Sequence, residues 1–181
     1  MKFEGLEISK YQPDFHGIKW VLRALSKNNH LIIYDRILFE DGYCVGTDGH
    51  RMHIYEYIGK YENGVYAKIL NSAGKIMLKL IPGQEYLDWK SLTSVAMKPS
   101  EIEITPDCSS TAYTEIIRNV DPSITIQFSY INDLIRSTFI KWIAYVYGAS
   151  DGIWFMADRR IGLIMPMFVL GGSAKRKEYK K

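Results

Sequence analysis

The sequence contains few cysteines and no long hydrophobic run. Its 181 residues include two cysteines, Cys44 and Cys108, so a disulfide framework is not expected and both thiols are predicted to be reduced, as in cytosolic proteins. The first residues, MKFEGLEISK, lack the apolar core of a secretory signal. The longest apolar stretch, IGLIMPMFVLGG, is shorter than a membrane span and contains a proline. We therefore expect a cytoplasmic protein with no membrane contact.

The charge is almost balanced, and the motifs of common enzyme classes are missing. The net charge is +3, with 24% charged and 47% hydrophobic residues, as in an ordinary soluble globular protein. The sequence has no nucleophile elbow, no phosphate-binding or dinucleotide-binding glycine motif, and no H-E-x-x-H or C-x-x-C zinc motif. We therefore expect no metal or other cofactor, and we predict that the protein is not an enzyme.

Hydrophobic periodicity predicts two halves with the same order of elements: a strand, a helix and three strands. Apolar residues at helical spacing predict helices near 14–28 and 130–141, with Asp14 as the N-cap of the first. Asp-Gly dipeptides at 41–42 and 48–49 predict turns between strands. We predict an α+β fold in which two β-α-β-β-β units form antiparallel sheets with both helices on one face.

The predicted organisation is a single domain over 1–171 with an expanded middle segment at about 58–122. Within this segment, VYAKIL and KIMLKLI predict two strands around a turn at 71–74, and GQEYLDWKSL predicts a loop or a short helix. The lysine-rich residues 172–181 predict a basic, flexible tail.

The predicted helices carry several cations. Lys19, Arg23 and Lys27 are spaced by four residues, which places them on one face of a helix that extends to residue 28. The second helix carries Arg136 and Lys141 in a weaker version of the pattern. Either this is a solvated helix face, or it contacts nucleic-acid phosphates without reading the base sequence.

The stretch TDGHRMH, residues 47–53, combines acidic, basic and imidazole side chains around one glycine. A metal or acid–base site is one interpretation, with Asp48 and His50 as its chemical groups. In a strand, however, His53 would point away from the face that Asp48 and His50 share. The other interpretation is a tight turn whose polar side chains stabilise the backbone.

Two sequence motifs resemble one known family. GTDGHRM is similar to the ATDGHRL segment in the middle domain of the bacterial DNA polymerase III beta sliding clamp. RIGLIMPMFV is similar to the clamp's C-terminal YVVMPMRL, and FSYINDLI resembles the helix entry FNVSYVLDVL. The motifs occur in the order found in the clamp family, so the chain resembles a short, divergent member of it. The family's chains are much longer, so a ring would need more subunits than theirs.

The resemblance implies a peptide-docking site and a DNA-facing surface. In the clamp family the two motifs line a pocket for short peptides of polymerases, clamp loaders and repair proteins, and the helices line the inner wall of a ring around duplex DNA. The implied peptide-binding residues are Thr47, Gly49, His50, Arg51, Met52, Ile164, Met165, Pro166 and Met167. The implied DNA-binding residues are Lys19, Arg23, Lys27, Arg136 and Lys141.

We therefore expect a DNA sliding clamp-like protein of replication that binds duplex DNA non-specifically and docks short peptides of polymerase or clamp-loader proteins. Its expected partners are duplex DNA, replication proteins that carry clamp-binding peptides, and further copies of itself in a homo-oligomer. Two alternatives remain. One is a clamp-like regulator or decoy that does not encircle DNA, and the other is a hydrolase or nuclease that uses Asp48 and His50.

Overall fold

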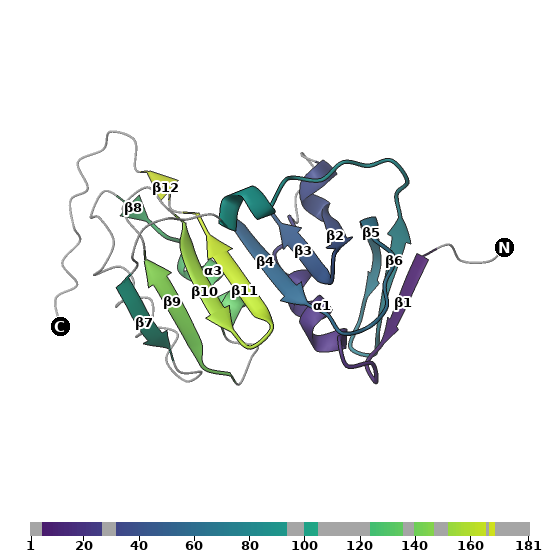
Figure 1. The fold of residues 1–181 in the computed structure, drawn as a ribbon, viewed down its shortest axis with the longest axis horizontal. Coiled ribbons are helices and arrows are strands. Elements are labelled where there is room, and N and C mark those ends of the chain that lie inside the picture. Colours follow the sequence, from purple (N-terminus) through teal and green to yellow (C-terminus); the bar gives the residue numbers. More distant parts are fainter. Residues whose placement is uncertain are drawn as a thin grey trace.

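The structure of the protein is a computed structural model, and it describes residues 5–26, 32–93, 100–104, 124–135, 140–146, 152–165 and 167–168. Ten strands in this part of the chain form one antiparallel sheet in the order β1-β6-β5-β2-β3-β4-β11-β10-β9-β7. Figure 1 shows the sheet extending across the molecule, with β4 and β11 side by side at its middle. A second sheet pairs β12 with β8.

The elements have the following bounds. The strands are β1 (Gly5–Ser9), β2 (Arg36–Glu40), β3 (Tyr43–Thr47), β4 (Arg51–Glu56), β5 (Gly64–Asn71), β6 (Lys75–Leu80), β7 (Ser100–Ile104), β8 (Ile124–Thr125), β9 (Trp142–Val146), β10 (Ile153–Ala157), β11 (Arg160–Ile164) and β12 (Met167–Phe168). The α-helices are α1 (Phe15–Val21) and α3 (Phe128–Ile135), and the 3-10 helices are η1 (Ile32–Asp35) and η2 (Lys90–Thr93).

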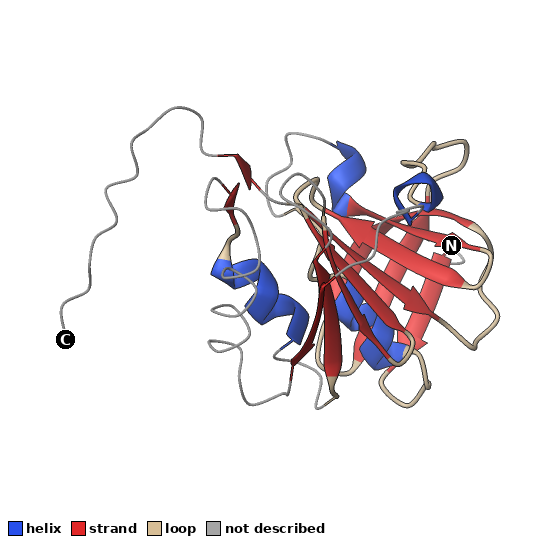
Figure 2. Ribbon diagram, turned by 60° about the vertical axis from the view of Figure 1, so that its left-hand side comes forward, coloured by secondary structure: helices blue, strands red, loops and turns tan. Residues whose placement is uncertain are grey.

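Both α-helices pack on the same side of the sheet, which we call the helix face (Figure 2). Ile18 and Trp20 of α1 and Leu134 of α3 belong to one apolar core with inward-facing strand residues. The helices approach the sheet most closely at glycines. A Cβ atom on Gly46 would lie 3.0 Å from the carbonyl oxygen of Val21. The predicted α+β class, with antiparallel strands and both helices on one face, is confirmed.

The first helix is shorter than predicted. It ends at Val21 rather than at residue 28, with Leu22 as its C-cap. The amides of Arg23 and Ala24 donate to carbonyl oxygens three residues earlier, which tightens the last turn. Apart from the exposed Arg23, the side chains of residues 20–25 are buried, so tertiary packing outweighs the helical period of the sequence.

The second half also differs from the predicted boundaries. The helix predicted near 130–141 begins earlier, at Phe128, and it follows the short strand β8, Ile124–Thr125. Lys141 does not lie on the described part of α3; it directly precedes β9.

The middle segment contributes strands to the same sheet. The predicted hairpin is confirmed as β5 and β6, which lie between β1 and β2 in the sheet. Residues 81–93, which we call the strap, include η2 and pack against the face opposite the helices, which we call the strap face. The predicted tail at 172–181 lies outside the described residues.

Asp14 precedes α1 as predicted, but it does not act as a side-chain cap. Its carboxylate is fully buried and accepts hydrogen bonds from the Tyr55 hydroxyl at 3.0 Å and from the amides of Ile58 and Gly59 at 3.1 and 2.7 Å. The aspartate thus ties the start of α1 to the chain that leaves β4. Cys44 is a free, buried cysteine in β3.

Candidate functional site

The turn between β3 and β4 is organised by short-range hydrogen bonds. The hydroxyl of Thr47 donates to the carbonyl oxygen of Arg51 at 2.6 Å and accepts a hydrogen bond from the amide of Gly49 at 3.0 Å. Gly49 has φ of 87°, a conformation that side chains disfavour. A Cβ atom there would also lie 3.1 Å from the ring of Tyr34. A glycine is therefore required at this point of the turn.

The carboxylate of Asp48 is engaged within the turn. It accepts hydrogen bonds from the amides of His50 and Arg51, both at 3.0 Å, and from Nε of Arg51 at 3.1 Å. This arrangement is an Asx turn extended by an ion pair. It supports the turn interpretation of the TDGHRMH stretch, because the carboxylate stabilises backbone and guanidinium groups.

Arg51 connects the turn to both helical regions. Its guanidinium donates to the carboxylate of Asp133 on α3 at 2.7 Å and to the carbonyl oxygen of Arg23, just after α1, at 2.8 Å. The same guanidinium lies 4.7 Å from the ring centre of Tyr130. With only 6% of its side chain exposed, Arg51 is a buried cross-link between sheet and helices.

A polar depression of about 470 Å³ opens beside this cross-link. The turn, the segment after α1 and the first turns of α3 contribute its lining residues: Leu25, Ser26, Asp48, His50, Arg51, Ser129, Tyr130 and Asp133. The rings of His50 and Tyr130 are nearly parallel, with centres 6.4 Å apart. The depression therefore presents polar and aromatic groups between the two helices.

The two sequence motifs meet within one chain. In the β4–β11 pair, Arg51 lies opposite Ile164 and Met52 lies opposite Leu163. The amide of Met165 extends the contact by donating to the carbonyl oxygen of His50 at 2.8 Å. No partner chain is needed to bring these segments together.

The nine implied peptide-binding residues do not share one face. Arg51 and Ile164 point to the helix face, whereas strand alternation places Thr47, Met52 and Met165 on the strap face. Gly49 and His50 lie in the turn. Pro166 and the side chain of Met167 lie outside the described part of the structure. A docking site built from both motifs would thus use the apolar members on the strap face.

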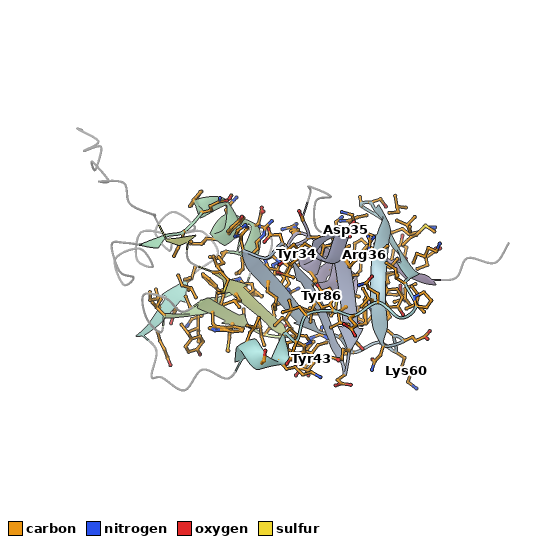
Figure 3. All side chains as sticks on the ribbon, turned by 90° about the horizontal axis from the view of Figure 1, so that it is seen from above. Tyr34, Asp35, Arg36, Tyr43, Lys60 and Tyr86 are labelled. Carbon is orange, nitrogen blue, oxygen red and sulfur yellow. The ribbon has the colours of Figure 1, made fainter. Side chains whose placement is uncertain are left out.

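The strap packs against this apolar surface. A second apolar cluster, separate from the core under the helices, contains Leu38, Val45, Met52, Ile54, Val65, Trp89, Trp154 and Leu163. Tyr86 and Leu87 of the strap pack against it. The Tyr86 hydroxyl donates to the carbonyl oxygens of Arg36 at 3.2 Å and Val45 at 3.4 Å (Figure 3), and burial raises its pKa. Met52 is only 3% exposed, whereas Met165 is 39% exposed.

His53 is a core residue. Its ring stacks on Trp20 with centres 4.1 Å apart, and Nδ1 lies 3.0 Å from the carbonyl oxygen of Trp20. Since a carbonyl can only accept, Nδ1 carries the proton. Burial lowers the pKa of His53 to about 3. In the described residues no three His, Cys, Asp or Glu side chains gather as metal ligands.

The implied DNA-binding cations have different surroundings. Lys19 is half-buried and donates to the carbonyl oxygen of Ser72 at 2.9 Å. Arg23 is exposed but follows α1, so it does not continue a helical stripe from Lys19. Lys141 pairs with Glu103 at 2.6 Å. Lys27 and Arg136 lie outside the described residues.

Sequence reasoning missed the residues that link the motif turn to the rest of the molecule. Asp133 and Tyr130 on α3 contact Arg51, and Tyr86 in the strap contacts β2 and β3. Tyr130 and Asp133 belong to the motif FSYINDLI, so the sequence indicated where they lie along the chain. It did not indicate that they contact Arg51. Nothing in the loop sequence GQEYLDWKSL identifies the strand that it covers.

Several solved beta subunits of DNA polymerase III are similar to this chain. A putative beta subunit from Eubacterium rectale aligns with a TM-score of 0.62 and 13% identity, over 92% of this chain and 66% of that chain. The beta subunit of Borrelia burgdorferi, solved in complex with a natural product, aligns with a TM-score of 0.63 and 15% identity over 91% and 64%. The Thermotoga maritima beta subunit gives a TM-score of 0.63 at 8% identity over 92% and 66%.

This chain has the fold of the DNA polymerase III beta sliding clamps. The chain spans 64–66% of the length of these three clamp chains, and at such low identities the likeness is one of fold. Comparison of the sequence with family models and with curated proteins gives no match. The comparison of three-dimensional structures thus confirms the resemblance that the two sequence motifs indicated.

The clamp fold is reached here with two α-helices among the described residues, one in each half of the chain. The halves join through the β4–β11 pair, and the TDGHRM and IMPM segments meet at one end of that pair. Within the described residues, no helix is long and apolar enough to cross a membrane.

Proposed function

We propose that this chain is a sliding clamp-like protein of DNA replication. It docks short peptides of polymerase or clamp-loader proteins on the strap face and binds duplex DNA without sequence preference on the helix face. The observation that carries the proposal is the meeting of the TDGHRM and IMPM segments, with Arg51 opposite Ile164 and Met165 bonded to His50, in a chain with the clamp fold.

The peptide-docking surface centres on Met165. Its side chain is 39% exposed at the end of β11, next to Thr47 and Met52 on the same face. Methionine is flexible and polarizable, so an exposed methionine beside an apolar cluster suits peptides of different sequence. Burial of such a side chain in an interface contributes about 1.5–3 kcal/mol. Pro166 and Met167 continue the surface in the sequence.

A matched pair of methionine variants tests this surface. Met165→Ala is expected to weaken binding of a polymerase C-terminal peptide by about tenfold, equivalent to about 1.4 kcal/mol. Met156→Ala is the control, because Met156 is 41% exposed at the other end of the β10–β11 hairpin. Calorimetric titration of both proteins measures the difference. Equal affinity in the two variants contradicts docking at Met165.

Duplex DNA binding is assigned to the helix face. Arg23 is exposed beside the polar depression, and Lys27 follows it in the sequence. Lys19 and Lys141 already have partners in the chain, so they contribute less to a phosphate-binding surface. Few phosphate contacts imply weak binding with a small salt slope, since each releases about 0.9 of a counterion.

Charge reversal tests this assignment in a protein without residues 172–181, because the lysine-rich tail would itself bind DNA. Arg23→Glu combined with Lys27→Glu is expected to lower duplex affinity and to reduce the salt slope by about two. Lys60→Glu changes an exposed lysine elsewhere and serves as the control. Identical salt slopes in the two variants would remove the helix face from the proposal.

Binding, rather than catalysis, is the proposed activity of the TDGHRMH stretch. Asp48 uses its carboxylate for the turn and for Arg51. His53 is stacked in the core, where burial lowers its pKa to about 3. Asp48 and His53 therefore have structural roles. His50, the other residue of the hydrolase alternative, has its ring nearly parallel to that of Tyr130 with ring centres 6.4 Å apart.

A further inference from the structure

The surface proposed for peptide docking is partly closed. Thr47, Met52 and Leu163 lie side by side across β3, β4 and β11 on the strap face. Their exposed fractions are 3%, 3% and 2%. Met165, the next residue on this face, is 39% exposed. A peptide that reaches Met165 would therefore find the adjoining apolar surface covered.

The strap supplies part of that cover. Trp89 belongs to the apolar cluster that contains Met52 and Leu163, and its ring centre lies 5.4 Å from that of Tyr43 at the start of β3. Tyr86 and Leu87 pack against the same cluster. The hydroxyl of Tyr86 reaches the carbonyl oxygen of Val45, a residue of β3 two positions from Thr47. Three apolar or aromatic side chains within four residues of an irregular segment thus occupy the strap face.

The amide of Ile81 at the start of the strap donates to the carbonyl oxygen of Val65 in β5 at 2.8 Å, and beyond Ile81 the contacts with the sheet come from side chains. The indole of Trp89 donates to the carboxylate of Glu40 at 3.1 Å, and Lys90 pairs with Glu40 and Asp41 at 3.1 and 2.7 Å. The backbone amides of Gln84, Trp89 and Leu92 donate to carbonyl oxygens within the strap itself. A segment attached in this way can leave the sheet without breaking a strand pair.

The strap also leaves part of its site unfilled. A depression of about 630 Å³ lies between it and the strands β2 and β5. Leu38 and Val65 contribute apolar lining from the strands, and Tyr86 and Leu87 contribute lining from the strap. An open depression thus lies between part of the strap and the strands that it borders.

We propose that the strap is an exchangeable occupant of the strap face, and that a partner peptide binds there by displacing it. The inference rests on the proposed function. It adds the chemistry of the peptide, and it identifies the strap as a segment of the same chain that competes with the peptide for the strap face. The ligand is a short extended peptide with a tyrosine, an aliphatic residue and a second aromatic residue spaced as in Tyr86, Leu87 and Trp89. It places these side chains on the cluster that contains Met52.

A peptide with the strap's own sequence, GQEYLDWKS (residues 83–91), is the direct probe. In the wild-type protein it competes with a tethered copy at an effective concentration in the millimolar range, so its binding is weak. Trp89→Ala removes the largest anchor of the resident strap and is expected to tighten binding of the added peptide at least tenfold. Tyr86→Phe, which removes only the hydroxyl contacts, is expected to have a smaller effect in the same direction.

Two controls accompany the titration. Lys60→Ala changes an exposed residue outside the strap and is expected to leave the wild-type affinity unchanged. A peptide with alanine in place of both Leu87 and Trp89 is expected not to bind any of the proteins. If the added peptide binds the wild type and Trp89→Ala equally, or binds neither, the exchange does not occur.

Hydrogen exchange on the wild-type protein provides a second measurement that needs no variant. A saturating concentration of the strap peptide is expected to speed amide hydrogen exchange in residues 83–91 of the protein, while the amides of β3 and β4 stay protected. Binding that leaves residues 83–91 protected overturns the proposal.

Failure of peptide docking and failure of strap exchange give different results. A polymerase peptide that binds the wild type and Trp89→Ala equally supports docking and rejects exchange. Binding of the strap peptide alone supports exchange and rejects the proposed partner.

Discussion

At the scale of single residues, the polar side chains of the first half take structural roles that depend on burial. His53 stacks on Trp20 and is bonded to its carbonyl oxygen, while Asp14 binds a tyrosine hydroxyl and two amides. A buried polar group is stabilising only when its hydrogen-bonding groups find partners. The partners of the Asp14 carboxylate and of Nδ1 of His53 come from distant parts of the chain, whereas Nε2 of His53 is buried without a partner among the described residues. A cluster of chemically reactive residue types can thus be assembled entirely for folding.

The burial of His53 predicts a specific pH dependence of stability. Burial lowers its pKa to about 3, against about 6.5 in the unfolded chain. The unfolded state then binds more protons between these values, so stability falls as pH decreases below about 6.5. From pH 7 to pH 5 this residue is expected to remove about 2 kcal/mol from the free energy of unfolding.

His53→Phe, which keeps an aromatic ring against Trp20, isolates this contribution. Urea denaturation at pH 7 and pH 5 is expected to show a loss smaller by about 2 kcal/mol in the variant than in the wild type. Other titrating groups are common to both proteins and cancel in the comparison. The same pH dependence in both proteins would mean that His53 titrates normally.

At the scale of elements, an arginine–aspartate contact stands at each end of the β4–β11 junction. Arg51 binds Asp133 of α3 at 2.7 Å at one end, and Arg159 approaches Asp14, just before α1, at 3.5 Å at the other. Each guanidinium also lies over a tyrosine ring, at 4.7 and 5.1 Å. Each contact joins the central strands to the chain in or beside a helix, so the two halves are held together beyond their backbone pairing.

Loss of the Arg51 cross-link is expected to be costly. In Arg51→Met, the carboxylate of Asp48 and the carbonyl oxygen of Arg23 each lose the hydrogen bond that the guanidinium donates. Because Arg51 is 6% exposed but Asp133 is 45% exposed, we expect a loss of about 2–3 kcal/mol in the free energy of unfolding, below the range for a fully buried pair.

Lys141→Met is the matched control, because Lys141 and Glu103 form an ion pair with 58% and 60% exposed side chains. Its effect is expected to stay within about 0.5 kcal/mol. Chemical denaturation of both variants measures the difference. Similar small losses would show that Arg51 contributes no more than a surface ion pair.

At the scale of the whole molecule, the sheet runs through both halves, and among the described residues it ends in the strands β1 and β7. Such edges offer backbone donors and acceptors to another chain. The chain spans 64–66% of the length of the clamp chains compared above. A closed ring would therefore require several copies of this 20.9 kDa chain.

The oligomeric state of the protein can be predicted and checked by its native mass. We expect the protein to sediment as a homo-oligomer at micromolar concentration, with a mass that is an integral multiple of 20.9 kDa. A mass that stays monomeric over the full concentration range, with and without duplex DNA, contradicts encirclement. That result would favour the clamp-like regulator that docks peptides without surrounding DNA.

The sequence by itself determined the class of elements and several local features of this protein. The Asp-Gly dipeptides at 41–42 and 48–49 mark turns between antiparallel strands, since positive φ at Gly42 and Gly49 is a local requirement. Apolar periodicity located both helices and the β5–β6 hairpin, and the motif resemblance pointed to the clamp fold. These signals depend on neighbours within a few residues, and a single sequence contains them.

Tertiary structure alone decided which residues are accessible and what they contact. It ended α1 at Val21, inserted β5 and β6 between β1 and β2, and covered the surface beside Met52 with the strap. It also paired Arg51 with Asp133, a residue 82 positions away. Periodicity states which side of an element is apolar, but not which distant segment covers it. That choice depends on the packing of the whole sheet, because burial and strand pairing are non-local interactions.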